Sequence, residues 1–263
     1  MKKIFSILLL TAMSATIALA KNTTQTDEQL VEKYLIISGQ KQAIEKMPTQ
    51  MVNMIEQQFA QSGQQVDPQL ADIIIEGLTN EEAIGKLTQG IQKLSSEDLN
   101  TLIAFYQTET GQKCAKLNKE EDMEDMNREL PSFIQELQTD PPSQDRIDNM
   151  NTMFTETNLL PGTLEMVKAV TKIFNASLPK EQQMNDEQID GLMMQASQPM
   201  AQQLIISFYY ALRNFTDNEI NEVVRMTLTP EGQAETDAQL AGMLAYMSTA
   251  STHLVSEISQ YKK

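Results

Sequence analysis

The chain has 263 residues, a formal net charge of −16 and a single cysteine. The negative charge repels nucleic acid and anionic lipid headgroups, so we expect neither as a partner. One cysteine excludes an internal disulfide framework, and one cysteine with one histidine excludes the usual His/Cys zinc sites. Long segments rich in Gln, Met, Leu and Glu, without β-branched residues alternating with polar ones, predict an all-α fold.

The first twenty residues have the pattern of a secretory signal peptide. Residues 2–3 are lysines, an apolar run begins at residue 4, and residues 18–20 form a small-x-small cleavage site, Ala-Leu-Ala. The run is too short and too interrupted to cross a bilayer, which takes roughly 20 apolar residues. We expect cleavage after Ala20, export to the periplasm or the medium, and no membrane-spanning segment. Loss of the two lysines changes the formal charge from −16 to −18.

Residues 29–59 predict a short helix, a glycine joint at Gly39 and then an amphipathic helix. The apolar face of that second helix consists of Ile44, Met47, Met51, Met54, Ile55 and Phe59. Pro68 predicts the start of a further helix, because proline is tolerated in a first turn.

A capped helix is predicted to begin after Ser95. The Ser95 hydroxyl can accept backbone N–H groups as the N-cap, and Asp98 at the N3 position can complete a capping box. Thr108 can cap the next helix in the same way. Gly111 then falls at the N3 position of that helix, where the missing Cβ would allow another backbone to approach closely.

The same features recur 121 positions later in the chain. Residues 94–112, "LSSEDLNTLIAFYQTETGQ", align without a gap with residues 215–233, "FTDNEINEVVRMTLTPEGQ". The shared positions are Ser95, Asp98, Thr108, Gly111 and Gln112 in the first segment, and Thr216, Glu219, Thr229, Gly232 and Gln233 in the second. A looser echo upstream places Gly162 opposite Gly39. The sequence therefore predicts two tandem helical-bundle repeats, residues 21–140 and 141–263, after the signal peptide at 1–20. A linker is predicted at residues 138–145, where two prolines end a helix.

Residues 29–126, and above all the segment "LSSEDLNTLIAFYQTETGQK", resemble the bacterial family known as domain of unknown function 2059. The pattern of the family is a capped helix that ends in Phe-Tyr-x-Thr-x-x-Gly-Gln-Lys. The second segment departs from it, because Met226-Thr227 replaces Phe105-Tyr106 and Ala234 replaces Lys113. The resemblance implies an exported helical bundle, and it implies no reaction.

No catalytic constellation is evident. His253 is expected to be a partly exposed helical residue, because no nucleophile elbow or oxyanion motif surrounds the nearby serines. Glu97 and Glu257 each follow a serine but lack the aromatic and glycine context of an enzyme cleft. Cys114 is either a small buried apolar residue or one half of an intermolecular disulfide.

Methionine is the most unusual component, with 17 copies. Most stand at helical spacing, in the groups Met47-Met51-Met54, Met123-Met126, Met150-Met153, Met193-Met194-Met200 and Met243-Met247. Methionine fills irregular helical cores and adaptable grooves. Thioethers can also hold a soft ion such as Cu(I), but this requires three or more sulfurs that converge on one point.

These observations predict an exported, non-catalytic binding or interaction module. We expect its ligand to be an apolar peptide, an apolar helix of an envelope protein or a lipid-like tail, and we expect no cofactor. The candidate groove is lined by Tyr106, Tyr209, Tyr210, Met193 and Met194. Two alternatives stay open: Cu(I) binding through the methionine groups, and a cell-envelope hydrolase that uses a Glu.

Overall fold

The structure is a computed structural model, and it describes residues 28–61, 68–120, 123–157, 159–178 and 180–261. The segment predicted to be a signal peptide lies outside the described residues. Within them the chain is helical and has no strand, which confirms the all-α prediction. The elements are α2 (Glu28–Ile37), α3 (Gln40–Gln61), α4 (Pro68–Leu78), α5 (Glu81–Gln89), η1 (Ile91–Lys93), α6 (Ser96–Tyr106), α7 (Glu109–Glu120), α8 (Met123–Thr139), α9 (Gln144–Glu156), α10 (Leu159–Ser177), η2 (Lys180–Gln182), α11 (Asp186–Ala211), α12 (Asp217–Thr227) and α13 (Pro230–Tyr261).

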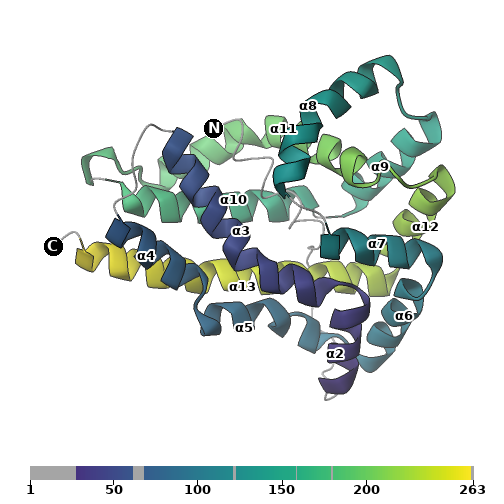
Figure 1. The fold of residues 1–263 in the computed structure, drawn as a ribbon, viewed down its shortest axis with the longest axis horizontal. Coiled ribbons are helices and arrows are strands. Elements are labelled where there is room, and N and C mark those ends of the chain that lie inside the picture. The colour runs from purple at the N-terminus through teal and green to yellow at the C-terminus, as the bar shows by residue number, and fades with distance from the viewer. Residues whose placement is uncertain (1–27, 62–67, 121–122, 158, 179, 262–263) are drawn as a thin grey trace.

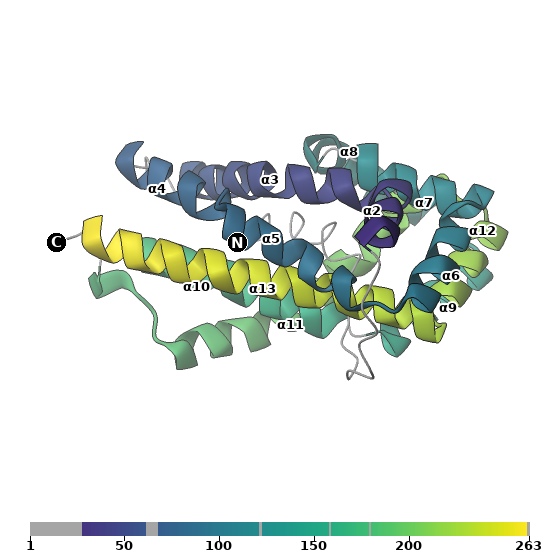
Figure 2. The same ribbon diagram turned by 90° about the horizontal axis from the view of Figure 1, so that it is seen from below.

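Helix α13 is the longest described element, with 32 residues. It packs against α4, α5 and α6 from the first half of the sequence and against α10 and α12 from the second half. Figures 1 and 2 show α13 as the yellow helix that runs along the molecule, with α5 and α10 beside it in both views. The two halves of the chain therefore share one framework helix.

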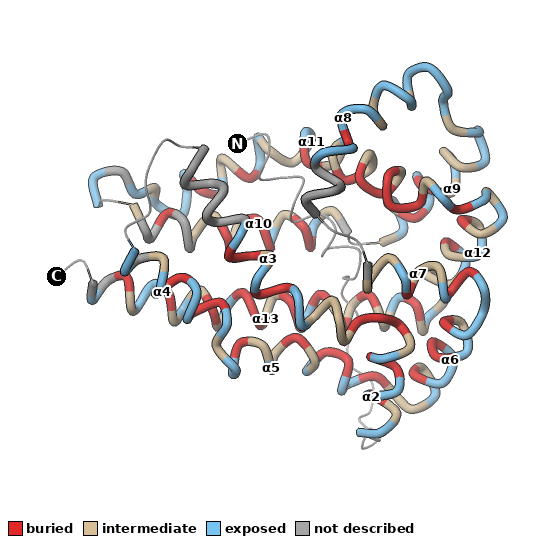
Figure 3. The backbone as a smooth tube through the Cα atoms, in the orientation of Figure 1, coloured by how far each residue is buried: buried red, intermediate tan, exposed pale blue. Residues whose placement is uncertain are grey.

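The largest hydrophobic cluster also contains residues from both halves. Figure 3 shows buried positions along α13 and along helices of both halves. Seven buried members of the cluster are methionines: Met47, Met51, Met166, Met193, Met200, Met243 and Met247. They are mixed with leucine, isoleucine and valine, for example Leu78 and Leu254, which are fully buried. Most of the methionine groups noted in the sequence thus contribute to packing between helices.

Two glycines set the distance between α5 and α13. A Cβ on Gly90 would lie 1.6 Å from the carbonyl oxygen of Ala238, and a Cβ on Gly242 would lie 2.5 Å from that of Leu87. Real Cβ atoms do not approach oxygen this closely, so the contact between the backbones of the two helices requires glycine at both positions.

The helix starts predicted around residues 95 and 216 are present. The Ser95 hydroxyl accepts from the Asp98 N–H at 3.1 Å, and the Asp98 carboxylate accepts from the Ser95 N–H at 3.1 Å. Thr216 and Glu219 form the same capping box at the start of α12. Both helices are thus fixed at the N-terminus by local side-chain chemistry.

The next helix start is also alike in the two segments. The hydroxyls of Thr108 and Thr229 accept from the N–H groups of Gly111 and Gly232, at 3.0 and 3.1 Å. A Cβ on Gly111 would lie 2.1 Å from the carbonyl oxygen of Phe105, and one on Gly232 would lie 2.0 Å from that of Met226. The backbone that each glycine approaches is therefore the end of the preceding helix, which allows a sharp corner between the helices.

One predicted joint is wrong. Gly39 does separate α2 from α3 and has a positive φ of 77°. Gly162, however, lies inside α10, which begins at Leu159. Pro161 stands in the first turn of α10, where a missing N–H leaves no helical hydrogen bond unmade, so the helix can start before the glycine. The linker predicted at residues 138–145 does separate α8 from α9, and Ser143 caps α9.

Candidate functional site

A carboxyl group of α13, that of Glu235, lies between three hydrogen-bond donors. Its Oε1 accepts from the hydroxyl of Tyr34 on α2, from the hydroxyl of Tyr106 on α6 at 2.8 Å, and from the amide of Gln239 one turn later at 3.4 Å. Gln239 also donates to the Tyr34 hydroxyl at 3.1 Å. The rings of Tyr34 and Tyr106 meet edge to face with centroids 6.1 Å apart. Three helices from distant parts of the sequence thus meet at one carboxyl oxygen.

The surroundings of the Glu235 carboxyl have two opposite effects on its pKa. Burial raises the pKa of Glu235, while the hydrogen bonds from Tyr34 and Tyr106 lower it, and the net effect is a raised pKa. Burial, with the charge of Glu235 nearby, raises the pKa of both tyrosines well above the ordinary value. The phenols therefore keep their protons and act as donors.

Beside Glu235 lies a cavity of about 170 Å³. Its walls come from α3, α5, α6 and α7 of the first half and from α9, α11, α12 and α13 of the second half. Most of the lining is apolar, for example Ala43, Ile44, Phe105, Phe208 and Val223. A mostly apolar lining is typical of small-molecule sites, but this cavity is smaller than most of them.

Few charged groups line this cavity. Among the described lining residues, Glu235 is the one acid and Lys46 is the one base. Lys46 is exposed, and its ammonium group donates to the backbone carbonyl of Lys119. Since an exposed residue belongs to the wall, the cavity reaches the surface beside α3.

Sulfur atoms are another common feature of the lining. The sulfur-containing lining residues are Met47, Cys114, Met153, Met226 and Met243. Burial, followed by the nearby acids Glu235 and Glu222, raises the pKa of the Cys114 thiol to about 12. A thiol with so high a pKa is a weak nucleophile at neutral pH, because the thiolate is the reactive form.

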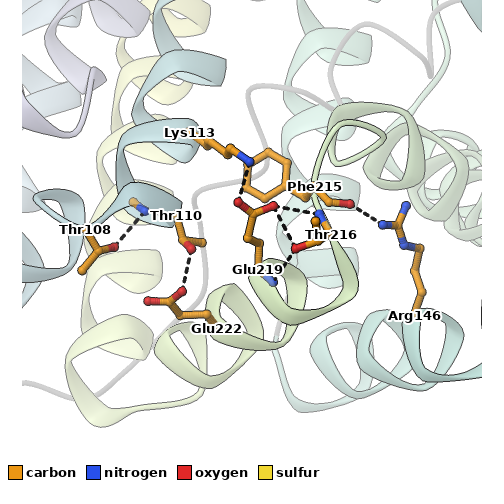
Figure 4. Close-up of polar contacts among 9 residues, drawn as sticks. Thr108, Thr110, Lys113, Arg146, Phe215, Thr216, Glu219 and Glu222 are labelled. Atoms are coloured by element: carbon orange, nitrogen blue, oxygen red, sulfur yellow. Dashed lines mark hydrogen bonds and ion pairs between the residues drawn. The ribbon is translucent and has the colours of Figure 1, made fainter.

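A polar joint holds α7 against α12 near the cavity, and Figure 4 shows it. The Lys113 ammonium forms an ion pair with Glu219, which also belongs to the capping box of α12, and it lies 5.8 Å from the ring centroid of Phe215. The Thr110 hydroxyl donates to Glu222 at 2.5 Å. From α9, Arg146 donates to the Phe215 carbonyl. Thr110 and Lys113, which stand close to Gly111 on α7, thus bind acidic side chains of α12.

The five residues of the predicted groove lie in different surroundings. Tyr106 lines the cavity and contacts Glu235. Tyr209 is half-buried against the hydrophobic cluster of α9, α11 and α12, whereas the Tyr210 hydroxyl donates to Glu129 at 2.7 Å. Met193 is buried in the largest cluster, and Met194 is 75% exposed. Of the five, only Tyr106 is among the described residues that line the cavity.

Three residues of the site were not singled out from the sequence: Tyr34, Glu235 and Gln239. One signal could have pointed to Glu235. When the alignment of residues 94–112 with 215–233 is extended toward the C-terminus, Glu235 stands opposite Cys114. Cys114 is half-buried on α7. A carboxyl at a position where the other segment has a small apolar group is unusual for a packed helix face.

The other acid and base candidates lie elsewhere. Glu97 is exposed on α6, and neither Glu257 nor His253 is among the described residues that line the cavity. His253 is partly exposed, and its Nδ1 is buried without a hydrogen-bond partner in the described part of the chain. No group of three or more His, Cys, Asp or Glu side chains within the described residues is placed to hold a metal ion.

The fold and the site define an all-α protein in which both halves of the chain line a small cavity beside a half-buried carboxyl. Residues 91–140, from η1 to the end of α8, match the model of a bacterial family described as "Uncharacterized protein conserved in bacteria (DUF2059)". This match confirms the resemblance to that family over those residues, while a second copy of the domain stays a prediction. No curated protein and no solved structure gives a significant match to the chain. Within the described residues, no helix combines the length and apolar character that a membrane crossing requires.

Proposed function

We propose that this protein is an exported binding module that takes a small, mostly apolar ligand into the cavity beside Glu235. The observation that carries the proposal is the cavity itself, which has about 170 Å³ of space, mostly apolar walls from both halves and one half-buried carboxyl. Export rests on the signal-peptide pattern of residues 1–20.

The volume limits the size of the ligand. A protein cavity of about 150 Å³ can hold benzene, so about 170 Å³ accepts a ligand of similar size or the end of a longer one. An apolar side chain of a peptide or the tip of an acyl chain has suitable dimensions. The remainder of such a ligand would leave the cavity beside Lys46, where the lining reaches the surface.

A pair of leucine variants tests the proposal. Ala43 lines the cavity on α3, so Ala43→Leu fills part of the space, whereas Ala241 is exposed on α13 outside it. We expect hexan-1-ol, measured by isothermal titration calorimetry, to bind the wild type and Ala241→Leu equally and Ala43→Leu at least about tenfold more weakly, because the filled space excludes the ligand. Equal binding by all three proteins, or binding by none of them, would contradict the proposal.

A second candidate function is the binding of Cu(I). It is favoured by the observation that Cys114 and four methionines line one cavity, since thiolate and thioether sulfurs are the ligands that Cu(I) prefers. Binding would remove the Cys114 proton, whose pKa is raised, so the affinity should increase with pH.

Cu(I) competition experiments test this second candidate. Met243→Leu removes a sulfur from the cavity wall, and the control Met194→Leu removes one that is 75% exposed and outside the described lining. We expect Met243→Leu alone to weaken binding. Native mass spectrometry of protein taken from the periplasm without refolding then separates the two functions, because a bound copper ion and a small organic ligand differ in mass. Cu(I) binding no tighter than to a generic peptide excludes the metal.

A further inference from the structure

We propose that the ligand of the cavity carries a protonated amine, which binds the carboxylate of Glu235 while its apolar part fills the rest of the cavity. This inference rests on the proposed function and specifies the chemical class of the ligand. Three observations support it. The two carboxyl oxygens of Glu235 have different numbers of hydrogen-bond donors, no cation within the described residues pairs with this carboxyl, and aromatic residues line the cavity.

The two oxygens of Glu235 have different surroundings. Oε1 accepts hydrogen bonds from Tyr34, Tyr106 and Gln239. No group within the described residues donates to Oε2, although the side chain lines the cavity. A carboxylate has about four acceptor positions, so a donor from a ligand can be added at Oε2 without loss of the existing hydrogen bonds.

Within the described residues, the half-buried carboxylate of Glu235 also has no ion pair with a cation. Its three donors are two phenols and an amide, all neutral. Lys46, the one base among the described lining residues, is exposed and donates to the carbonyl of Lys119. An ionised carboxyl without a counter-charge is costly to bury, so a cationic ligand gains more from this site than a neutral one.

The rest of the lining suits an organic cation. The rings of Phe105, Tyr106 and Phe208 line the same cavity as Glu235, and aromatic faces attract ammonium groups. The remaining wall is largely aliphatic or thioether, which favours an unbranched alkyl chain. Both the carboxylate of Glu235 at the site and the net charge of −16 repel an anionic ligand. The ligand class is therefore a short-chain aliphatic or arylalkyl amine, or the amine-bearing end of a larger molecule.

Three ligands of equal chain length test the inference: hexylamine, hexan-1-ol and hexanoate, titrated by calorimetry near pH 7. We expect hexylamine to bind the wild type at least about tenfold more tightly than hexan-1-ol, and hexanoate to bind most weakly, because a hydrogen bond to a charged group is the stronger kind. This comparison needs only the wild-type protein.

Two charge-neutralising variants then locate the amine. In Glu235→Gln the side chain keeps its shape and an acceptor oxygen, so we expect hexylamine to lose about tenfold to a hundredfold in affinity while hexan-1-ol changes little. Glu231→Gln removes the same charge from α13 at a residue outside the described lining, and should leave both affinities unchanged.

The possible outcomes separate the inference from the proposed function. If hexan-1-ol binds in a manner sensitive to Ala43→Leu but hexylamine binds no better, the amine inference is overturned and the cavity function stands. Equal loss of hexylamine affinity in Glu231→Gln and Glu235→Gln would also overturn it, because the preference would then reflect overall charge. If none of the three ligands binds, both proposals fall.

Discussion

The Tyr106 hydroxyl donates a 2.8 Å hydrogen bond to Oε1 of Glu235, a residue 129 positions later in the chain. This contact joins the segment that matches the bacterial family, residues 91–140, to the framework helix α13. Tyr106 is also the residue of the sequence-predicted groove that lines the cavity. The relation between these two side chains therefore links the most recognisable part of the sequence to the candidate site.

Removal of the Tyr106 hydroxyl should destabilise the protein in a pH-dependent manner. Tyr106→Phe leaves the half-buried Glu235 carboxylate with one donor fewer, which costs about 1–3 kcal/mol at neutral pH. The loss of the donor raises the folded-state pKa of Glu235 further, so stability should fall more steeply as pH rises above the unfolded value of about 4.3. Below that pH the carboxyl is protonated in both states and the penalty should shrink. Urea unfolding between pH 4 and pH 8 measures this penalty, and a penalty that does not vary with pH would contradict the role of Tyr106 as a donor to the Glu235 carboxylate.

Asp237 should lower the stability of the protein at neutral pH. Its Oδ2 is buried without a hydrogen-bond partner among the described residues, and burial raises the pKa of its carboxyl to about 7. A raised folded-state pKa means that stability falls as pH increases from about 4 through about 7. We expect Asp237→Asn to stabilise the protein by about 1 kcal/mol at pH 8, well below the full value of the shift because water reaches part of the side chain. The gain should vanish near pH 4.

Asp217 provides the control with the opposite sign. Hydrogen bonds from Ser143 and Arg146 hold the pKa of its carboxyl below the ordinary value. Its contribution is present above the unfolded pKa and is lost as pH falls, so Asp217→Asn should destabilise slightly at pH 8, by less than about 1 kcal/mol. If the Asp217 and Asp237 variants changed the stability in the same direction, the general loss of negative charge would explain both changes.

The close approach of α5 to α13 should make Gly90 sensitive to the smallest substitution. Gly90→Ala places a methyl group 1.6 Å from the Ala238 carbonyl oxygen, so the helices must separate, at a cost of about 3 kcal/mol or more. Gly85, inside α5, has nothing within 4 Å of the corresponding position. Gly85→Ala should therefore stabilise by about 0.5–1 kcal/mol, because alanine is the better helix former. Thermal unfolding of both variants gives the result, and equal shifts would contradict the close contact.

The ion pair between Lys113 and Glu219 should distinguish the two capping boxes. Glu219→Gln keeps an acceptor for the cap but loses the ion pair, whereas Asp98→Asn neutralises the equivalent carboxylate, for which no ion pair is present in the described structure. We expect the Glu219 variant to cost about 0.2–1 kcal/mol more than the Asp98 variant. A double-mutant cycle with Lys113→Met should return a coupling energy of that size. A coupling of zero would mean that water screens the pair completely.

The sequence predicted the local features of the fold, and it could do so because their causes are local. The capping boxes at Ser95 and Thr216 depend on side chains three residues apart, and the linker between α8 and α9 depends on two adjacent prolines. Gly162 shows the limit of such patterns, because a glycine after a proline fits a first helical turn as well as a joint.

The candidate site could not be predicted in the same way. Tyr34 and Glu235 are 201 residues apart, and no spacing rule connects them. A glutamate on an amphipathic helix is usually solvated, so its partners become evident only when α2, α6 and α13 are placed together. Tyr106 was recognised because it belongs to one of the few aromatic clusters of the chain and a buried tyrosine needs a polar partner, whereas Tyr34 and Gln239 carried no comparable signal.

The position of α13 along the chain has a consequence for the order of folding. Helices α4, α5 and α6 pack on a 32-residue helix that begins only at Pro230, and the Tyr34 hydroxyl finds its acceptor at Glu235. A nascent chain therefore cannot complete the largest hydrophobic cluster, which contains Met243, Tyr246 and Leu254 of α13, until α13 has been made. Contacts over such long separations slow folding, because a large loop must close before they form. Late completion of this cluster would suit the export that we propose, because it delays full packing of the chain until its synthesis is nearly finished.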